Sequence, residues 1–260
     1  MIRGWGARSD RGSVRKVNED ALVAWPPIFL VADGMGGHAA GDVASRIAAE
    51  QFERMVGHEV VSVADAISAI EQANKAIVQC IVSDPTRAGM GTTIAVLAVV
   101  RLGGSEHWLV LNVGDSRVYR LAGGGLQQMT SDHSEAEEMV AAGRLSPTEA
   151  RHYLRRHVVT RALGTNPAPQ VDSWIFPPEP GDRFLVCTDG LTNELDDDEI
   201  SHCLKTQVDP RAAAEQLVRR AIAAGGRDNV TVIVVDGPPL VEVGMAEDTV
   251  PRHQERSPSI

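Results

Sequence analysis

The chain of 260 residues has only three cysteines and no Cys-x-x-Cys pair. An odd, scattered set of cysteines provides neither a disulfide framework nor a zinc site, so we expect each thiol to fill core space. The chain also lacks an apolar run of about 18 residues, which a membrane-spanning helix would need, and an N-terminal signal peptide. These absences predict a cytoplasmic protein without a membrane anchor.

Basic and aromatic side chains are scarce as well. Acidic residues outnumber basic ones by 35 to 25, and aromatic residues make up 4% of the chain. Nucleic-acid-binding surfaces need the opposite, a basic patch with aromatic side chains for stacking. Nucleic acid is therefore not an expected partner, and a metal-dependent nuclease or phosphodiesterase is disfavoured.

Apolar periodicity divides the chain into runs of strands separated by pairs of helices. Helices are predicted at 40–56 and 62–83, at 134–142 and 147–152, and at 197–206 and 210–224. Strands are predicted near 2–9, 20–25, 28–33, 92–101, 108–113, 117–121, 126–128, 171–176, 183–188 and 229–235. Because strand and helix do not strictly alternate, the pattern favours an α+β fold with helical pairs covering packed sheets. Residues 1–236 are predicted to form one domain, and the Pro-, Glu- and Ser-rich stretch 237–260 a disordered tail.

Carboxylates stand at the ends of several predicted core strands. Asp33 ends the apolar run 28–32 and precedes a glycine-rich turn. Three more strands end or begin beside Asp115, Asp189 and Asp228, and a further strand follows the pair Glu19-Asp20. A single aspartate at a turn is ordinary. Several that converge would repel one another strongly unless cations neutralised them.

Oxygen ligands without a Cys or His pattern select hard ions such as Mg²⁺ or Mn²⁺. A pair of such ions bridged by one carboxylate suits hydrolysis of a phosphate ester, because a water between them becomes hydroxide near neutral pH and attacks phosphorus in line. Phosphate also needs a cationic contact. Arg15, four residues before Glu19, is a candidate for bidentate binding of the phosphoryl oxygens.

With these motifs in view, the chain resembles the metal-dependent protein phosphatases of the PP2C type, in the bacterial branch that opposes Ser/Thr kinases. The matching motifs occur in the order of that family and span about residues 3–236. They are Ser9-Asp10-Arg11-Gly12, Arg15, Asn18-Glu19-Asp20, Asp33-Gly34-Met35-Gly36-Gly37-His38, Gly89-Met90-Gly91-Thr92-Thr93, Gly114-Asp115-Ser116-Arg117, Thr130, Asp132-His133-Ser134, Thr160-Arg161-Ala162-Leu163-Gly164, Thr188-Asp189-Gly190-Leu191 and Gly225-Gly226-Arg227-Asp228-Asn229-Val230-Thr231.

The resemblance implies a four-layer fold, in which a β-sandwich of two antiparallel sheets is flanked by pairs of helices. It implies hydrolysis of phosphoserine and phosphothreonine in proteins. Phosphorylated proteins, namely Ser/Thr kinases and their substrates, are the implied partners, and we expect a monomer.

The resemblance also assigns roles by position. Asp33 bridges the two ions, the Gly34 carbonyl binds one of them, and Asp189 and Asp228 ligate the other. The remaining implied roles are support of the centre by Glu19 and Asp20, directly or through water, a third ion held by Asp115 with Asp189, and phosphate binding by Arg15.

Two stretches depart from the family pattern. Well-studied eukaryotic members carry a histidine after Asp-Gly, proposed as the general acid, whereas this chain has Met35. His38 is then a candidate proton donor, and a metal-bound water is the alternative. The flap at about 134–158 contains Arg155-Arg156-His157, which is more basic than usual. A basic flap favours acidic phosphosites.

Two other classes of function remain as alternatives. Gly34-x-Gly36-x-x-Ala39 follows a strand, with Glu53 further on, as in dinucleotide-binding oxidoreductases. Asp33 would repel a pyrophosphate there, and a second helix stands where the next strand should be. A pseudophosphatase that only binds phosphoproteins is the other alternative. Hydrolysis of p-nitrophenyl phosphate with Mn²⁺ would distinguish an enzyme from it.

Overall fold

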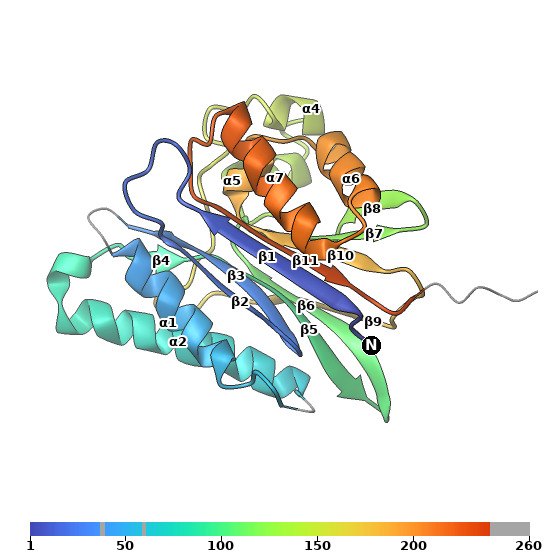
Figure 1. Ribbon diagram of the computed structural model, residues 1–260. Helices are drawn as coiled ribbons and strands as arrows, with labels where there is room; N and C mark the ends of the chain where they lie inside the picture. Colours follow the sequence, from blue (N-terminus) through green and yellow to red (C-terminus); the bar gives the residue numbers. More distant parts are fainter. Residues whose placement is uncertain (37–39, 59–60, 240–260) are drawn as a thin grey trace, which may run out of the picture.

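The computed structural model describes residues 1–36, 40–58 and 61–239. Two sheets built from antiparallel strand pairs face each other, and a pair of helices covers the outer face of each (Figure 1). The predicted α+β sandwich of four layers is therefore confirmed. Among the described residues, no helix has both the length and the apolar character needed to cross a membrane.

The first sheet has the strand order β1-β11-β10-β7-β8. Its strands are β1 (Gly4–Asp10), β7 (Arg117–Ala122), β8 (Gly125–Gln128), β10 (Arg183–Cys187) and β11 (Val230–Asp236). Helices α6 (Asp197–Thr206) and α7 (Pro210–Ala224) pack on its outer face through a buried apolar cluster. The first and last strands among the described residues, β1 and β11, thus pair with each other.

The second sheet has the order β2-β3-β5-β6-β9, and a short strand, β4, pairs with β3. Its strands are β2 (Asp20–Trp25), β3 (Ile28–Met35), β4 (Gly91–Thr92), β5 (Ile94–Leu102), β6 (Ser105–Val113) and β9 (Asp172–Phe176). Helices α1 (Gly41–Glu53) and α2 (Val63–Ser83) cover it. The remaining short elements are η1 (Pro85–Arg87), α3 (Glu135–Ala141), α4 (Pro147–Ala150) and α5 (Asp189–Thr192).

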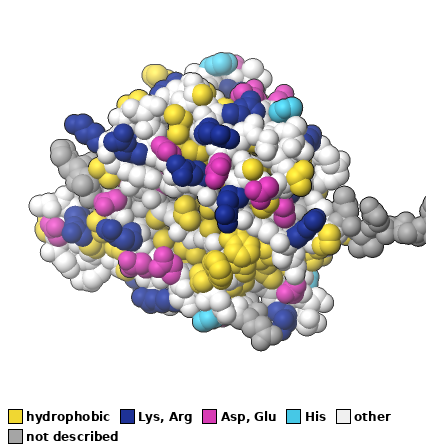
Figure 2. Space-filling view, viewed as in Figure 1, with side chains coloured by type: hydrophobic (Ala, Val, Ile, Leu, Met, Phe, Trp, Pro, Cys, Tyr) yellow, Lys and Arg dark blue, Asp and Glu magenta, His cyan; other side chains and the backbone are white. Residues whose placement is uncertain are grey.

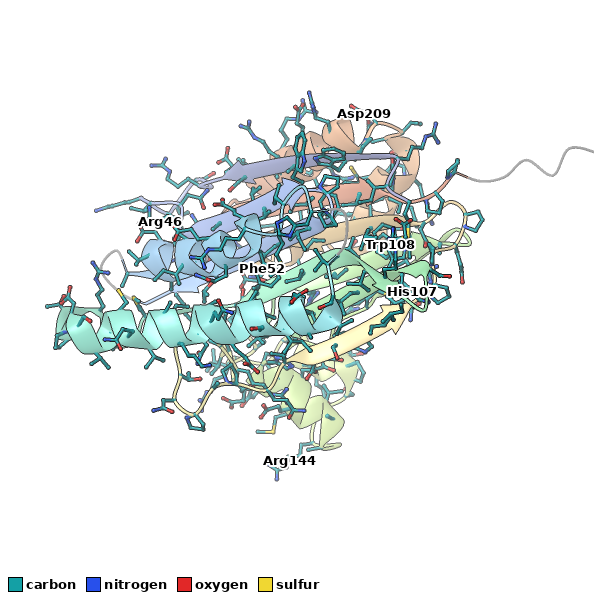
Figure 3. All side chains as sticks on the ribbon, turned by 90° about the horizontal axis from the view of Figure 1, so that it is seen from below. Arg46, Phe52, His107, Trp108, Arg144 and Asp209 are labelled. Carbon is teal, nitrogen blue, oxygen red and sulfur yellow. The ribbon has the colours of Figure 1, made fainter. Side chains whose placement is uncertain are left out.

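Strand β3 is buried on both faces, which explains its unbroken apolar run. Phe29 and Val31 point into the core between the sheets, whereas Ile28 and Leu30 pack in the outer core together with Phe52 of α1 (labelled in Figure 3). Burial of each such side chain contributes about 1.5–3 kcal/mol. A strand so firmly held is a rigid base for the aspartate near its end.

The structure differs from the predicted elements at two places close to that end. The strand predicted at 92–101 is broken into β4 and β5, because the Thr93 side chain accepts the backbone N–H of Asp33. Helix α5 was not predicted, since four residues are too few to show helical periodicity. Both differences lie beside the strand-end carboxylates.

The outer strands of the two sheets, β1 and β2, contact each other along one side of the sandwich. Figure 2 shows hydrophobic side chains gathered on the face where β1 lies in front. Trp5 of β1 and Trp25 of β2 meet edge to face, with ring centroids 5.2 Å apart. This contact joins the two sheets at their open edges.

Candidate metal centre

The strand ends meet around a cavity of about 900 Å³, which residues of the loop 11–19 and of the segment after α4 also line. Most of the residues singled out by sequence line it, namely Arg15, Glu19, Asp33, Gly34, Asp115, Asp189 and Asp228. Asp20 lies behind the cavity wall, where its carboxylate accepts the hydroxyls of Thr188 and Thr231. His38 lies outside the described residues.

The backbone of Asp33 is fixed on both sides. Its N–H donates to Thr93 Oγ1 (3.1 Å), and its carbonyl accepts Thr93 N–H (2.9 Å) and the Thr92 hydroxyl (2.9 Å). Because these bonds occupy the backbone groups, the carboxylate is the polar group of Asp33 that can serve the cavity. It lines the cavity.

Gly34 stands where three segments of backbone approach closely. Its N–H donates to the carbonyl of Glu19 (3.2 Å), and a Cβ at this position would collide with the carbonyl of Gly41. The Ser45 hydroxyl of α1 donates to the same Glu19 carbonyl (2.6 Å). Only glycine fits at this junction, so the strand end, the loop and the start of α1 are held together.

Asn229 joins the loop before β11 to the loop between β1 and β2. Its amide donates to the carbonyls of Arg11 (3.0 Å) and Val17 (2.9 Å), and its side-chain oxygen accepts Glu19 N–H (2.8 Å). The adjacent Asp228 is thereby tied to Glu19, although they are 209 positions apart in sequence.

Glu194, just beyond α5, holds the same loop from its other side. Its carboxylate accepts three N–H groups of Arg227: the backbone N–H (2.9 Å), Nε (3.0 Å) and Nη2 (2.8 Å). The Glu194 side chain is only 2% exposed, and the bonds from Arg227 lower its pKa. Asp228 is thus flanked by two anchored neighbours, Arg227 and Asn229.

The carboxylates raise one another's pKa values. Burial, followed by repulsion from neighbouring carboxylates, raises the pKa of Asp33 and of Asp115 well above the usual range, and that of Asp189 as well. Burial raises the pKa of Asp20 to about 7, although its two threonine hydroxyl donors act in the opposite direction. One oxygen each of Asp20 and Asp189 is buried without a hydrogen-bond partner. This surplus of negative charge would favour a bound cation.

The donor set consists of oxygen atoms, which fits Mg²⁺ or Mn²⁺. Within the described ranges, no three His, Cys, Asp or Glu side chains are arranged to hold one ion by themselves. Hard ions of this kind retain several waters when they bind to proteins. The Gly34 carbonyl and water would therefore complete the coordination that the carboxylates begin.

Arg15 reaches across the cavity to the loop before β11. Its Nη2 donates to Asp228 Oδ2 at 2.6 Å, and this bond raises the pKa of Arg15. The side chain is about half exposed (49%). Its other N–H groups make no hydrogen bond with the described residues, so they can bind an anion while Asp228 orients the guanidinium.

Several residues around the cavity were not assigned a role from sequence. Each of them acts through contacts between segments that are distant in the chain, and a local sequence pattern does not reveal such contacts. They are Thr93, Asn229, Glu194 and Arg227. His157 also lines the cavity, and burial followed by the charge of Arg156 lowers its pKa. It is therefore mostly neutral near pH 7 and a weak proton donor.

A family model for protein phosphatase 2C matches residues 11–224. The serine/threonine phosphatase stp of Listeria welshimeri is 35% identical over 250 residues, covering 88% of this chain and 94% of the relative. The crystal structure of the Mycobacterium tuberculosis serine/threonine phosphatase PstP/Ppp superposes with a TM-score of 0.85 at 34% identity, covering 92% of this chain and all of that one. The catalytic domain of PstP in complex with two manganese ions has a TM-score of 0.80 at 35% identity, covering 90% and 97% of the two chains.

Proposed function

The chain belongs to the protein phosphatase 2C family, and we propose that the cavity at its strand ends is the catalytic centre. The protein is a serine/threonine protein phosphatase of the bacterial type, and it depends on divalent metal ions. The observation that carries the assignment of the centre is the meeting of buried carboxylates from distant strand ends beside Arg15.

In the proposed centre Asp33 and the Gly34 carbonyl would help to hold two ions, Mn²⁺ or Mg²⁺. Asp189 and Asp228 would provide further carboxylate ligands. Glu19 and Asp20 support the centre, and Asp115 with Asp189 provides a place for a third ion. Burial and neighbouring carboxylates raise the pKa values of Asp33, Asp115 and Asp189, which supports these assignments because bound cations would favour the charged carboxylates.

When bound, two such ions supply an activated water and neutralise charge on the phosphoryl group. The chain's own residues bind and orient the substrate. Arg15 contacts the phosphoryl oxygens, held by its bond to Asp228. Met35 lines the cavity but has no proton to give, and His157 is mostly neutral. His38 remains the side-chain candidate for the general acid, with water as the alternative.

Hydrolysis of p-nitrophenyl phosphate tests the proposal directly. We expect turnover with added Mn²⁺ and its loss on chelation with EDTA. A folded chain that binds phosphopeptides but turns over no phosphate ester would instead be a pseudophosphatase.

We further propose that residues 1–236 form the catalytic domain. We also propose that the protein acts as a cytoplasmic monomer that reverses Ser/Thr kinase signalling.

Replacement of Arg15 tests the phosphate contact. We expect Arg15→Ala to raise KM by about 10- to 100-fold, with a smaller effect on kcat, because a charge-assisted hydrogen bond contributes about 1.5–3 kcal/mol. Steady-state kinetics on a phosphothreonine peptide measure both constants. Arg8→Ala is the matched control, since Arg8 lies on β1 and pairs with Asp10 outside the cavity. An unchanged KM in Arg15→Ala would show that this guanidinium does not touch substrate.

Replacement of Glu194 tests whether it positions Asp228. We expect Glu194→Ala to weaken Mn²⁺ binding by about 10- to 100-fold, as loss of a group that orients metal ligands usually does. Arg227→Ala keeps the backbone N–H that bonds Glu194 and should weaken binding less. Titration calorimetry with Mn²⁺ measures both. If both variants only lowered the melting temperature and bound Mn²⁺ normally, the Glu194–Arg227 contact would serve stability alone.

A further inference from the structure

Two cationic side chains at the mouth of the cavity are free to meet a ligand. Lys16 belongs to the loop between β1 and β2, and Arg156 to the segment that follows α4 (Figure 1). Both residues are exposed. Neither side chain makes a hydrogen bond or an ion pair with any residue that the structure describes. They are therefore distinct from Arg15 and Arg227, which are bound to carboxylates at the same cavity.

The neighbouring contacts explain why Arg156, and not Arg155, serves the cavity. Arg155 pairs with Glu135 of α3 at 2.8 Å, and the Tyr153 hydroxyl donates to the same carboxylate at 2.8 Å. These two bonds hold the segment against α3. Arg156 and His157 line both the catalytic cavity and an adjoining one of about 660 Å³, whereas Arg155 lines neither of these two cavities.

The carboxylates that line the catalytic cavity do not neutralise Lys16 and Arg156. Six carboxylates and four Lys or Arg side chains line the catalytic cavity. Glu194 is occupied by Arg227, and the other five are the proposed ligands and supports of the metal ions. Two divalent ions would turn the excess of two negative charges into an excess of two positive ones. An anionic ligand is then favoured at the mouth.

The adjoining cavity also contains carboxylates, but most are engaged. Asp196 accepts the N–H of Glu199 at the start of α6, Asp197 accepts the Tyr119 hydroxyl, and Glu199 pairs with Arg220. Among the described residues, none of these carboxylates forms a hydrogen bond or an ion pair with Arg156. The Arg156 guanidinium is thus available on both sides of the junction between the cavities.

From these two unpaired cationic side chains at the cavity we infer that Lys16 and Arg156 select phosphoprotein segments with acidic side chains next to the phosphorylated residue. The inference rests on the proposed function, since a substrate whose phosphate lies in the cavity has its neighbouring residues near Lys16 and Arg156. The net charge of −10 on the whole chain does not oppose it. Charges beyond a Debye length of about 8 Å are screened at physiological ionic strength, so the contacting charges decide.

Three phosphothreonine peptides that differ only in two flanking positions test the inference. These positions carry glutamate, alanine or lysine. We expect kcat/KM to be about tenfold higher for the glutamate peptide than for the lysine peptide, because one exposed ion pair changes affinity by up to about fivefold. Fluorescence anisotropy with non-hydrolysable phosphonate analogues should show the same order of affinity. The difference should shrink in about 1 M NaCl, where the Debye length is about 3 Å.

Two matched variants locate the effect. Arg156→Gln should reduce the preference for glutamate several-fold, and Arg156→Glu should reverse it. Arg155→Gln removes the same charge one position earlier and should leave the preference unchanged, since Arg155 is bound to Glu135. Equal reduction by Arg155→Gln and Arg156→Gln would point to the general charge of the flap and overturn the assignment to Arg156.

The outcomes separate this inference from the proposed function. If the unaltered chain hydrolyses p-nitrophenyl phosphate with Mn²⁺ but treats all three peptides alike, the inference is wrong and the function stands. If it hydrolyses none of these substrates, the proposed centre fails and the inference fails with it. A preference for the lysine peptide would also overturn the inference.

Discussion

We expect Asp33→Asn to lower kcat for p-nitrophenyl phosphate by about a thousandfold in saturating Mn²⁺. A metal ion contributes several kcal/mol of transition-state stabilisation, and about 1.4 kcal/mol corresponds to a factor of ten in rate. Asp33 is a proposed ligand of the two ions. The amide of asparagine keeps the shape of the side chain but cannot supply a negatively charged ligand. Titration calorimetry should show weaker Mn²⁺ binding in the same variant.

The same substitution should stabilise the metal-free fold. Burial and the charges of Asp20, Asp189 and Asp115 raise the pKa of Asp33 well above its usual range, so its charge is unfavourable without a cation. We therefore expect a higher melting temperature in EDTA for Asp33→Asn than for the unaltered chain. Asp198→Asn, on the exposed first turn of α6, is the control and should change neither activity nor stability appreciably. Turnover within a few-fold of normal in Asp33→Asn would remove Asp33 from the centre.

The layers of the fold were predictable because their signal is local. Apolar stripes of helical period and buried apolar runs identify the helices and strands one at a time, and the absence of strict alternation indicates packed sheets. The pairing of β1 with β11 is different. It joins residues more than 200 positions apart, and no feature of 4–10 or 230–236 specifies the partner. The ordered set of family motifs, rather than periodicity, implied the closed sandwich.

The candidate metal centre likewise contains residues that the sequence predicts and residues that only the structure identifies. Aspartates next to core strands stand out in the sequence because a charge beside a buried run is costly. Thr93 belongs to a matched family motif but was given no role, and Glu194 belongs to none of the matched motifs. Their roles come from contacts with Asp33 and Arg227 across the fold. The bond between Arg15 and Asp228 is likewise visible only in the structure.

The raised pKa of Asp20 predicts how the stability of the metal-free protein depends on pH. Its carboxyl is buried with one oxygen unpartnered, and its pKa is about 7 in the folded chain against an ordinary value of 3.8. The folded chain therefore binds this proton more tightly than the unfolded chain does. The resulting stability is fully present below about pH 4 and is lost as pH rises through 7. Asp33 and Asp115, whose pKa values burial also raises, act in the same direction.

In EDTA we expect the free energy of unfolding to fall between about pH 4 and pH 7, with at most about 4 kcal/mol of the fall due to Asp20. Asp20→Asn removes this titrating group and should flatten that part of the profile. Saturating Mn²⁺ should reverse the slope, because the ions bind the deprotonated carboxylates and stabilise the fold by about 4 kcal/mol at a thousandfold excess over Kd. Denaturation with urea across this pH range, with EDTA or Mn²⁺, measures both effects. Equal slopes in the two conditions would mean that the buried carboxylates do not bind the ions.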